Sequence, residues 1–417
     1  MSMSKLVGLL SAAAIMMALG TSAFAQQKTV KIGAVFPLTG QAASAGVHAK
    51  AAIEVALDII NNAHPELGNF PLAKNAGLAG LGGAKLEVVF ADNQGSPATG
   101  QNQALRLITE EKVVALTGAY QSGITLTTSA ISEKYGIPFV NGESVAANLT
   151  ERGFKWFFRT TPIATDFAKV YYDFLTEMKA SGAKTDHIAL VHDTTEYGAS
   201  VAATITSAFK EKGIAIAQDV AYTTNATDVQ SQVLQLKEKK PDVVIMISYT
   251  SDAILFAKTM QSLDYKPPML LADDAGYSDP SFLKAVGKIS IGAFNRSSWS
   301  VGAPGSATAI IAKLYKDKSG DEMDDTAARE MQGFFVLADA IDRAGSTESA
   351  KIQAALKATD MKPEQLMMGY KGIKFDDKGQ NILASGLIIQ LQDGENYVAV
   401  FPKANAEKAP VMPYKGW

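Results

Sequence analysis

The stretch VVALTGAYQSGITLTTSA, residues 113–130, shows the pattern that decides the fold. An apolar run from Val113 to Thr117 ends in a polar turn with Gln121, Ser122 and Gly123, and a segment with helical spacing follows. A buried strand that leads directly into a helix is the repeating unit of an α/β protein. Continuous apolar strands, as opposed to alternating ones, indicate a parallel sheet covered by helices on both faces.

The same alternation of strand and helix occurs along much of the chain. Before residue 160 the predicted strands are residues 30–36, 85–91, 113–118 and 137–142, and after Pro162 they are residues 187–193, 214–221, 242–249 and 268–274. The C-terminal part differs, because helices predicted over 307–318, 326–344 and 350–357 precede strands predicted at 371–377 and 386–402. We therefore expect two doubly wound α/β lobes in tandem, with the late helices returning to the first lobe. The Gly- and Pro-rich segment 64–83 is predicted to be a surface excursion.

Composition limits the classes of function. The chain has 417 residues, 47% hydrophobic and 19% charged, with a formal net charge of −3, so it can bury a large core. Basic residues are outnumbered and form no cluster interleaved with aromatic residues, so nucleic-acid binding is not expected. The absence of cysteine excludes disulfides, thiol nucleophiles and a lipid anchor on an N-terminal cysteine.

Residues 1–25 have the features of a signal peptide that is removed. Lys5 precedes an apolar segment from Leu6 to Leu19, and Ala23-Phe24-Ala25 has the A-x-A form of a cleavage site. The mature chain is therefore predicted to begin at Gln26. No later segment approaches ~20 uninterrupted apolar residues, so we expect an exported, soluble protein. A large cysteine-free exported chain fits the bacterial periplasm.

The turn before the helix at 124–135 is a candidate anion site. Ligands of open parallel sheets bind at the carboxyl ends of strands, and this turn lies at such an end. Ser122 and Gly123 begin the helix, where N–H donors and a partial positive charge attract an anion and glycine allows close approach. Tyr120 and Gln121 belong to the same turn. The alternative is that Ser122 only caps its own helix.

Aromatic and acidic residues at other strand ends complete the candidate set. Tyr197 and Tyr249, together with Tyr120, can wall a pocket with flat faces and hydroxyls, although core packing explains any single tyrosine equally well. Asp273-Asp274 can hold a cationic group, unless the pair forms a solvated turn. Glu143, directly after a strand-ending Asn-Gly, is a further acid at this edge.

Catalytic signatures are weak. The chain has no phosphate-binding loop, H-E-x-x-H or G-x-G-x-x-G, and GESVA (142–146) lacks the final glycine of a nucleophile elbow. An exported hydrolase would use Ser144 with His192, whose neighbour Asp193 could orient it; a structural hydrogen bond is the alternative for His192. No metal site, cofactor or catalytic residue is expected.

Motifs along the whole predicted mature chain are those of one family. They are IGAVFPLTG (32–40), ADNQGSPATG (91–100), YGIPFVNGES (135–144), RGFKWFFRTTP (152–162), ALVHDTTEYGAS (189–200) and GFFVLADAI (333–341). With these motifs the chain resembles the periplasmic solute-binding proteins of ABC importers, of the leucine/isoleucine/valine-binding class. The resemblance implies a type I periplasmic binding fold, in which three crossings join two lobes that close over a ligand. It places 26–160 and 299–375 in the first lobe, and 161–298 and 376–417 in the second.

The resemblance also implies roles for single residues. Ser122 matches the serine that receives the ligand's α-carboxylate, Tyr197 and Tyr249 match two aromatic residues of the second lobe, and Asp274 matches the acid that pairs with the α-ammonium. The turn Glu143-Ser144-Val145 departs from the family, whose amino-acid binders have a small residue and a threonine there. In an ungapped alignment Val145 replaces the threonine, and a shift by one residue lets Ser144 provide the hydroxyl.

We therefore predict a monomeric periplasmic protein that captures a small carboxylate-bearing solute and delivers it to an inner-membrane ABC permease. The main expectation for the solute is an amino acid of the branched-chain or neutral type, or a close relative. An amine-free aromatic or keto acid, or an amide, urea or polyamine-like solute, is the alternative. The alternative from a different class is the exported hydrolase.

Overall fold

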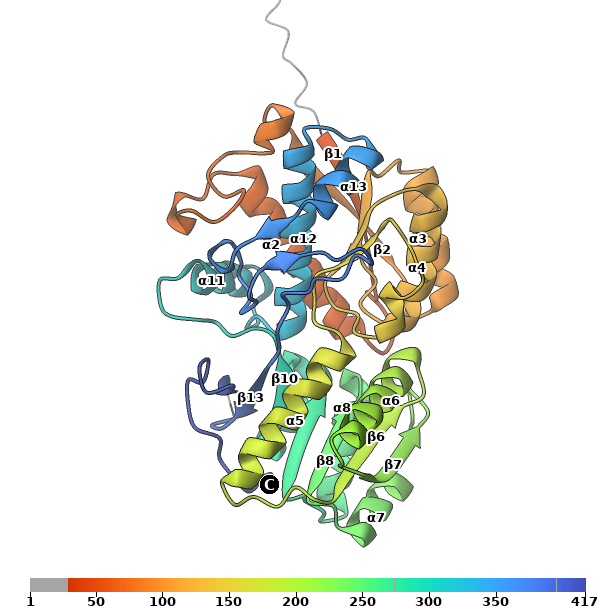
Figure 1. Cartoon of the computed structure of the whole chain (residues 1–417), viewed down its shortest axis with the longest axis vertical. Coiled ribbons are helices and arrows are strands. Elements are labelled where there is room, and N and C mark those ends of the chain that lie inside the picture. The colour runs from red at the N-terminus through yellow and green to blue at the C-terminus, as the bar shows by residue number, and fades with distance from the viewer. Residues whose placement is uncertain (1–28, 274, 395) are drawn as a thin grey trace, which may run out of the picture.

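The computed structural model describes residues 29–273, 275–394 and 396–417, and it contains two α/β units stacked along the long axis of the molecule (Figure 1). Each unit is built on its own sheet, so the predicted fold class of two doubly wound units is confirmed. The predicted signal peptide lies outside the described residues, as does Asp274. No helix among the described residues is long and apolar enough to cross a membrane.

The first unit contains a five-stranded sheet with the order β2-β1-β3-β4-β5, in which all neighbours are parallel. Its strands are β1 (Thr29–Phe36), β2 (Lys85–Asp92), β3 (Ala115–Gly118), β4 (Phe139–Asn141) and β5 (Phe157–Arg159). Its helices are α2 (Ala43–Asn61), α3 (Pro97–Thr109), α4 (Ser122–Tyr135), α11 (Ala307–Ser319), α12 (Asp325–Ala344) and α13 (Ser349–Lys357). Residues of β1 alternate between two apolar cores, one shared with α2 and α12 and the other with α3 and α4.

The second unit contains a seven-stranded sheet with the order β14-β13-β10-β9-β8-β6-β7. Its strands are β6 (Ile188–Asp193), β7 (Ile216–Tyr222), β8 (Val243–Ile247), β9 (Met269–Asp273), β10 (Phe294–Ser297), β13 (Leu387–Leu391) and β14 (Tyr397–Phe401). Its helices are α5 (Ala164–Ala180), α6 (Glu196–Glu211), α7 (Gln230–Lys239), α8 (Thr250–Ser262), α9 (Ala275–Ser278) and α10 (Pro280–Val286). Strands β6 to β10 are parallel, and β13 and β14 add an antiparallel edge.

The strand predicted over 371–377 is wrong in length. Only β12 (Ile373–Lys374) is a strand there, and it pairs with β11 (Asp360–Met361) in a separate two-stranded sheet. The chain then turns back, because the N–H of Gly379 donates to the carbonyl oxygen of Asp376. The Asp-Lys-Gly sequence after Asp376 favours this tight turn over a longer strand.

Segment 64–83 is more than a surface excursion. It contains two short 3-10 helices, η2 (Pro65–Leu67) and η3 (Ala79–Leu81), and it buries several apolar side chains in the core shared with α12. Phe70 is 3% exposed, and its ring meets the edge of Phe335 with centroids 5.0 Å apart. Full burial of such a side chain contributes about 1.5–3 kcal/mol, so the segment is part of the folded unit.

Two of the places where the chain is predicted to cross between the lobes, near residue 160 and near residue 375, lie side by side. Arg159, at the end of β5, donates its N–H to Gly379 and accepts at its carbonyl from Asn381. Its Nε also donates to Oε1 of Gln380 at 2.7 Å. These bonds hold the chain near residues 159–162 against the chain near 375–381, next to the carboxyl ends of β4 and β5.

Candidate functional site

The turn between β3 and α4 has an unusual backbone. Ala119 and Tyr120 both have positive φ, at 73° and 53°, a conformation uncommon for residues other than glycine and an outlier for a bulky one. Such local strain persists only where the surroundings hold it, and it concentrates at functional sites. Gln121 precedes the first helical residue without a side-chain cap bond, and Ser122 is that first residue. The capping interpretation of Ser122 is therefore not what the geometry shows.

The candidate residues from the two units meet in one small cavity. Seven of the ten predicted ligand residues line it, and the list is Tyr120, Ser122, Glu143, Ser144, Val145, Tyr197 and Tyr249. An eighth residue, Arg296 from the end of β10, completes the wall. Side chains nearly fill the cavity in this structure: its free volume is about 10 Å³, against roughly 300–1,000 Å³ in pockets that hold drug-sized ligands. This space admits about one water molecule, so a solute can enter only if the two units move apart.

Three tyrosines with mutually tilted rings form a wall of the cavity. The ring of Tyr249 lies 5.9 Å from that of Tyr120 and 5.1 Å from that of Tyr197, measured between centroids. Tyr120 comes from the first unit; in the second, Tyr249 directly precedes α8 and Tyr197 lies in the first turn of α6. All three are 2–3% exposed. The rings thus close the space between the units with surfaces suited to flat or aliphatic groups.

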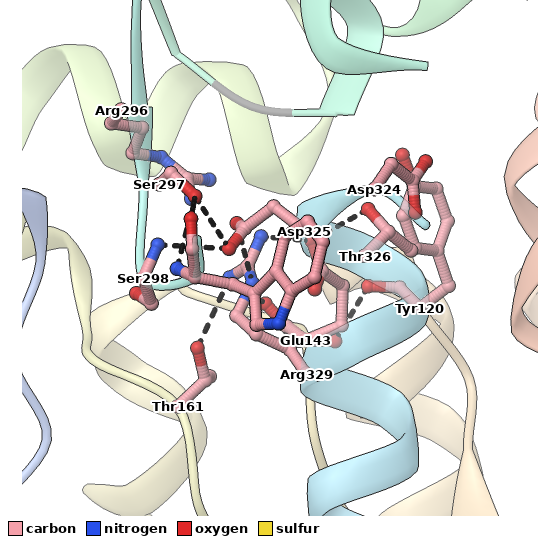
Figure 2. Close-up of polar contacts among 12 residues, drawn as sticks. Tyr120, Glu143, Thr161, Arg296, Ser297, Ser298, Asp324, Asp325, Thr326 and Arg329 are labelled. Carbon is pink, nitrogen blue, oxygen red and sulfur yellow. Dashed lines mark hydrogen bonds and ion pairs between the residues drawn. The ribbon is translucent and has the colours of Figure 1, made fainter. Parts of the chain in front are cut away.

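Glu143 lies in a buried network of charges at the first unit's side of the cavity (Figure 2). Its Oε1 is 2.5 Å from an Nη atom of Arg329, whose Nε is 2.8 Å from Asp325. Asp325 also accepts from the hydroxyl of Ser297 and from the N–H of Ser298, which ties α12 to the end of β10. Gly142 makes the close approach possible, since a Cβ there would lie 2.5 Å from the carbonyl oxygen of Arg329.

Ser144 is engaged within the first unit. Its hydroxyl donates to the carbonyl of Tyr120 at 2.7 Å and lies 2.6 Å from the Thr125 hydroxyl. His192, by contrast, contacts the carbonyl of Asp193 at 2.7 Å and the carboxylate of Asp219 at 3.0 Å. These partners give the hydrolase alternative no support, because a serine nucleophile and its base must lie within hydrogen-bond reach.

Asp273 does bind a cationic group, and this group is the side chain of Arg296. Its Oδ1 lies 2.9 Å from Nε of Arg296 and accepts from the hydroxyl of Tyr197 at 2.7 Å. Its other oxygen accepts from the hydroxyl of Tyr171 at 2.5 Å. The Arg296 guanidinium also stacks on the ring of Phe167, with Cζ 4.1 Å from the centroid. Arg296 is therefore held in a fixed position at the second unit's side of the cavity.

Three predicted residues remain: Gln121 and Gly123 are the sequence neighbours of Ser122, and Asp274 lies outside the described residues. Gln121 is 9% exposed, and Gly123 follows Ser122 in the first turn of α4. The role of Asp274 stays a prediction, because it lies outside the described residues. No group of His, Cys, Asp and Glu side chains in 29–273, 275–394 and 396–417 is arranged to hold a metal ion.

Sequence reasoning missed Arg296 and Arg329. Both are 1% exposed, and each stands in a buried run, AFNRSS (293–298) and AAREMQGFFV (327–336). A charged residue inside a buried run is expected to have a charged partner, since burying an unpaired charge is costly. That signal identifies the arginines; Asp325 is close to Arg329 in sequence, whereas Glu143 and Asp273 come from other elements.

The two α/β units and the small cavity between them define a two-lobed binding protein with the type I periplasmic binding fold. The profile of a family described as "Periplasmic binding protein" matches residues 29–395. The chain is 31% identical to the Leu/Ile/Val-binding protein homolog 8 of Brucella suis biovar 1 (strain 1330) over 410 residues, 96% of this chain and 97% of the relative. It is also 31% identical to homolog 7 of Brucella abortus (strain 2308), over 90% of this chain and 92% of that one.

Solved structures show the same fold at lower identity. The branched-chain amino acid transporter substrate-binding protein LivJ from Streptococcus pneumoniae, in complex with isoleucine, has a TM-score of 0.75 at 22% identity and covers 90% of this chain and 100% of that one. An ABC transporter solute-binding protein from Rhodopseudomonas palustris BisB5, in complex with 3,4-dihydroxybenzoic acid, has a TM-score of 0.73 at 19% identity, with coverages of 93% and 98%. The chain belongs to the periplasmic binding protein family, in its Leu/Ile/Val-binding class, which confirms the resemblance read from the sequence.

Proposed function

We propose that this protein is the substrate-binding component of an ABC transporter and that it captures a small carboxylate-bearing solute, with an amino acid of the branched-chain or neutral type as the main expectation. The observation that carries the proposal is the single cavity formed by Ser122 with tyrosines of both units. Relatives named for leucine, isoleucine and valine binding support the solute class.

The first unit receives the carboxylate in this mechanism. Ser122 begins α4, whose first N–H groups and partial positive charge favour an anion. The second unit then closes and brings Tyr197 and Tyr249 over the solute, with Asp274 as the proposed partner of an α-ammonium. Binding shifts the equilibrium toward the closed arrangement because only that arrangement supplies both sets of contacts.

The remaining roles follow from the family. We further propose that the protein acts as a monomer in the periplasm and passes its solute to an inner-membrane permease. It carries out no covalent chemistry. An amine-free aromatic acid is a second candidate solute, supported by the three-tyrosine wall and by the dihydroxybenzoate complex of the Rhodopseudomonas palustris neighbour.

A thermal-shift screen followed by calorimetry tests the proposal. A ligand that binds the native state raises the unfolding temperature by mass action. Neutral amino acids, 2-oxo acids, aromatic acids, amides and polyamines are compared at equal concentration. We expect carboxylates to give the largest shifts; a set of shifts confined to amides or polyamines would sink the proposal.

A further inference from the structure

We propose that Arg296 is a ligand-binding residue that meets the solute's carboxylate from the second unit, while Ser122 and the start of α4 meet it from the first. This inference rests on the proposed function and deepens it. It makes the carboxylate a requirement for tight binding of the solute.

The charges on the wall favour a solute with a negative group. Glu143 and Arg296 are the charged residues among the described side chains that line the cavity. Glu143 is paired behind the wall with Arg329, which lies 2.5 Å from it and also pairs with Asp325. Arg296 stands on the opposite unit and is likewise paired, with Asp273, so what its guanidinium and the N-terminal end of α4 bring to the two sides of this small space is N–H donors for an anion.

The guanidinium is positioned as a recognition group is expected to be. Asp273 binds its Nε at 2.9 Å, and Phe167 lies against its flat face. Asp273 is itself fixed by hydroxyls of Tyr171 and Tyr197. Side chains locked in this way present a preorganised fork, and arginine recognises carboxylates through such a fork in a planar, bidentate geometry.

A carboxylate contacted by both Ser122 and Arg296 also explains how ligand binding is coupled to closure of the two units. A carboxylate held at Ser122 in an open form would face Arg296 only after the second unit approaches. The closed form then gains a charge-assisted contact in a buried place, where it is stronger than in water. Polyamines meet like charge at Arg296, and amides lack the negative charge, so both classes of alternative solute are disfavoured.

The experiment compares matched acid and amide pairs by calorimetry. The pairs are L-leucine with L-leucinamide, L-phenylalanine with L-phenylalaninamide, and benzoate with benzamide. In the wild type we expect at least one acid to bind about 100-fold more tightly than its amide. In Arg296→Gln we expect that acid to lose about 30- to 100-fold in affinity, while the amide changes by less than about threefold. Charge-assisted hydrogen bonds of this kind are the stronger class.

Further variants separate a direct contact from a structural role. Arg296→Lys keeps the charge without the fork and should fall between the wild type and Arg296→Gln. The double variant R296Q/D273N leaves no unpaired buried acid and should fold even if Arg296→Gln does not, with the same loss of the acid-to-amide ratio. Tyr171→Phe removes one bond to Asp273 outside the cavity wall and should keep that ratio.

The outcomes are distinguishable. If an acid binds the wild type tightly and the R296Q and R296Q/D273N variants bind it within threefold, with an unchanged acid-to-amide ratio, the role of Arg296 is refuted and the proposed function stands. If no acid of the three pairs or of the wider screen binds the wild type, the proposed function and this inference fall together.

Discussion

His48 of α2 lies opposite Asp279 of the second unit, with Nδ1 of the histidine 3.9 Å from Oδ1 of the aspartate. Asp279 also accepts from the hydroxyl of Ser44 on α2 at 2.8 Å. Lys284 of α10 pairs with Asp321 of the first unit at 2.5 Å, and Nε2 of His48 lies 3.5 Å from that same Asp321. The two units therefore contact each other through a cluster of charges that contains a buried histidine, 6% exposed.

This cluster makes stability depend on pH. Burial lowers the pKa of His48, but Asp324, whose Oδ2 is 3.8 Å from Nδ1, and the charges of Asp279 and Asp321 raise the pKa overall from 6.5 to about 9. A pKa raised in the folded state means that the stabilisation is fully present below pH 6.5 and is lost as the pH rises through 9. We expect the wild-type free energy of unfolding to fall over this window by on the order of 3 kcal/mol more than that of His48→Gln. Urea unfolding at pH 6 to 9 measures this.

His187 provides the matched control, since it is exposed on the surface of the second unit. His187→Gln should reproduce the wild-type pH profile. If His48→Gln also keeps the wild-type slope between pH 6.5 and 9, the histidine is not the group that links protonation to stability. The groups that face His48 are Asp279, Asp321 and Asp324, with Lys284 behind Asp321.

Replacing Ser122 tests the proposed carboxylate contact. Its hydroxyl accepts only a long bond, 3.4 Å, from the N–H of Ala146, so Ser122→Ala should change the unfolding temperature little. A hydrogen bond to a charged group contributes about 1.5–3 kcal/mol, which corresponds to roughly 10- to 100-fold in affinity. Calorimetry should show this loss for Ser122→Ala. Ser129→Ala, on the same helix but bonded to the carbonyl of Thr125, should bind as the wild type does.

The network around Arg329 predicts an order of stabilities. Arg329 forms ion pairs with two buried acids, Glu143 and Asp325, whereas Glu143 pairs with one arginine, Arg329. Removing one partner of a buried pair costs about 3–5 kcal/mol, because a charge is left unpaired. Arg329→Met should therefore lower the free energy of unfolding by at least this amount and by more than Glu143→Gln. Equal costs in urea unfolding would contradict this assignment of partners.

Much of the fold could be predicted because it depends on local pattern. Buried runs such as 187–193 and 242–249 are nearly the observed strands β6 and β8, since a parallel strand covered on both faces must be apolar throughout. The strand predicted at 371–377 failed because the same apolar signal does not determine where a turn interrupts pairing. Segment 64–83 looked irregular, yet Phe70 and Leu78 anchor it in the core.

The site was predictable only in part. Ser122, Tyr197 and Tyr249 stand at strand ends, and the topology brings such positions to the carboxyl edge of each of the two sheets. Arg296 was missed because its importance depends on Asp273, Phe167 and Tyr171, which lie far away in the sequence. Long-range charge pairing cannot be read from a single sequence, although a lone arginine in a buried run indicates that a partner exists.

Alanine substitutions at two glycines in first turns of helices should separate an effect on folding from an effect on binding. A Cβ at Gly198 of α6 would lie 2.2 Å from the carbonyl oxygen of Asp193, whereas one at Gly123 of α4 would have its nearest neighbour, Cβ of Glu196, at 3.6 Å. Gly198→Ala should lower the free energy of unfolding by about 1–3 kcal/mol through overpacking. Gly123→Ala should leave the free energy of unfolding unchanged or raise it by up to about 1 kcal/mol, because alanine is the better helix former.

If the solute's carboxylate approaches the N–H groups of α4, the new methyl group of Gly123→Ala should weaken its binding at least about tenfold in calorimetry. Unchanged affinity would mean that the carboxylate contacts the Ser122 side chain without approaching the backbone beside it.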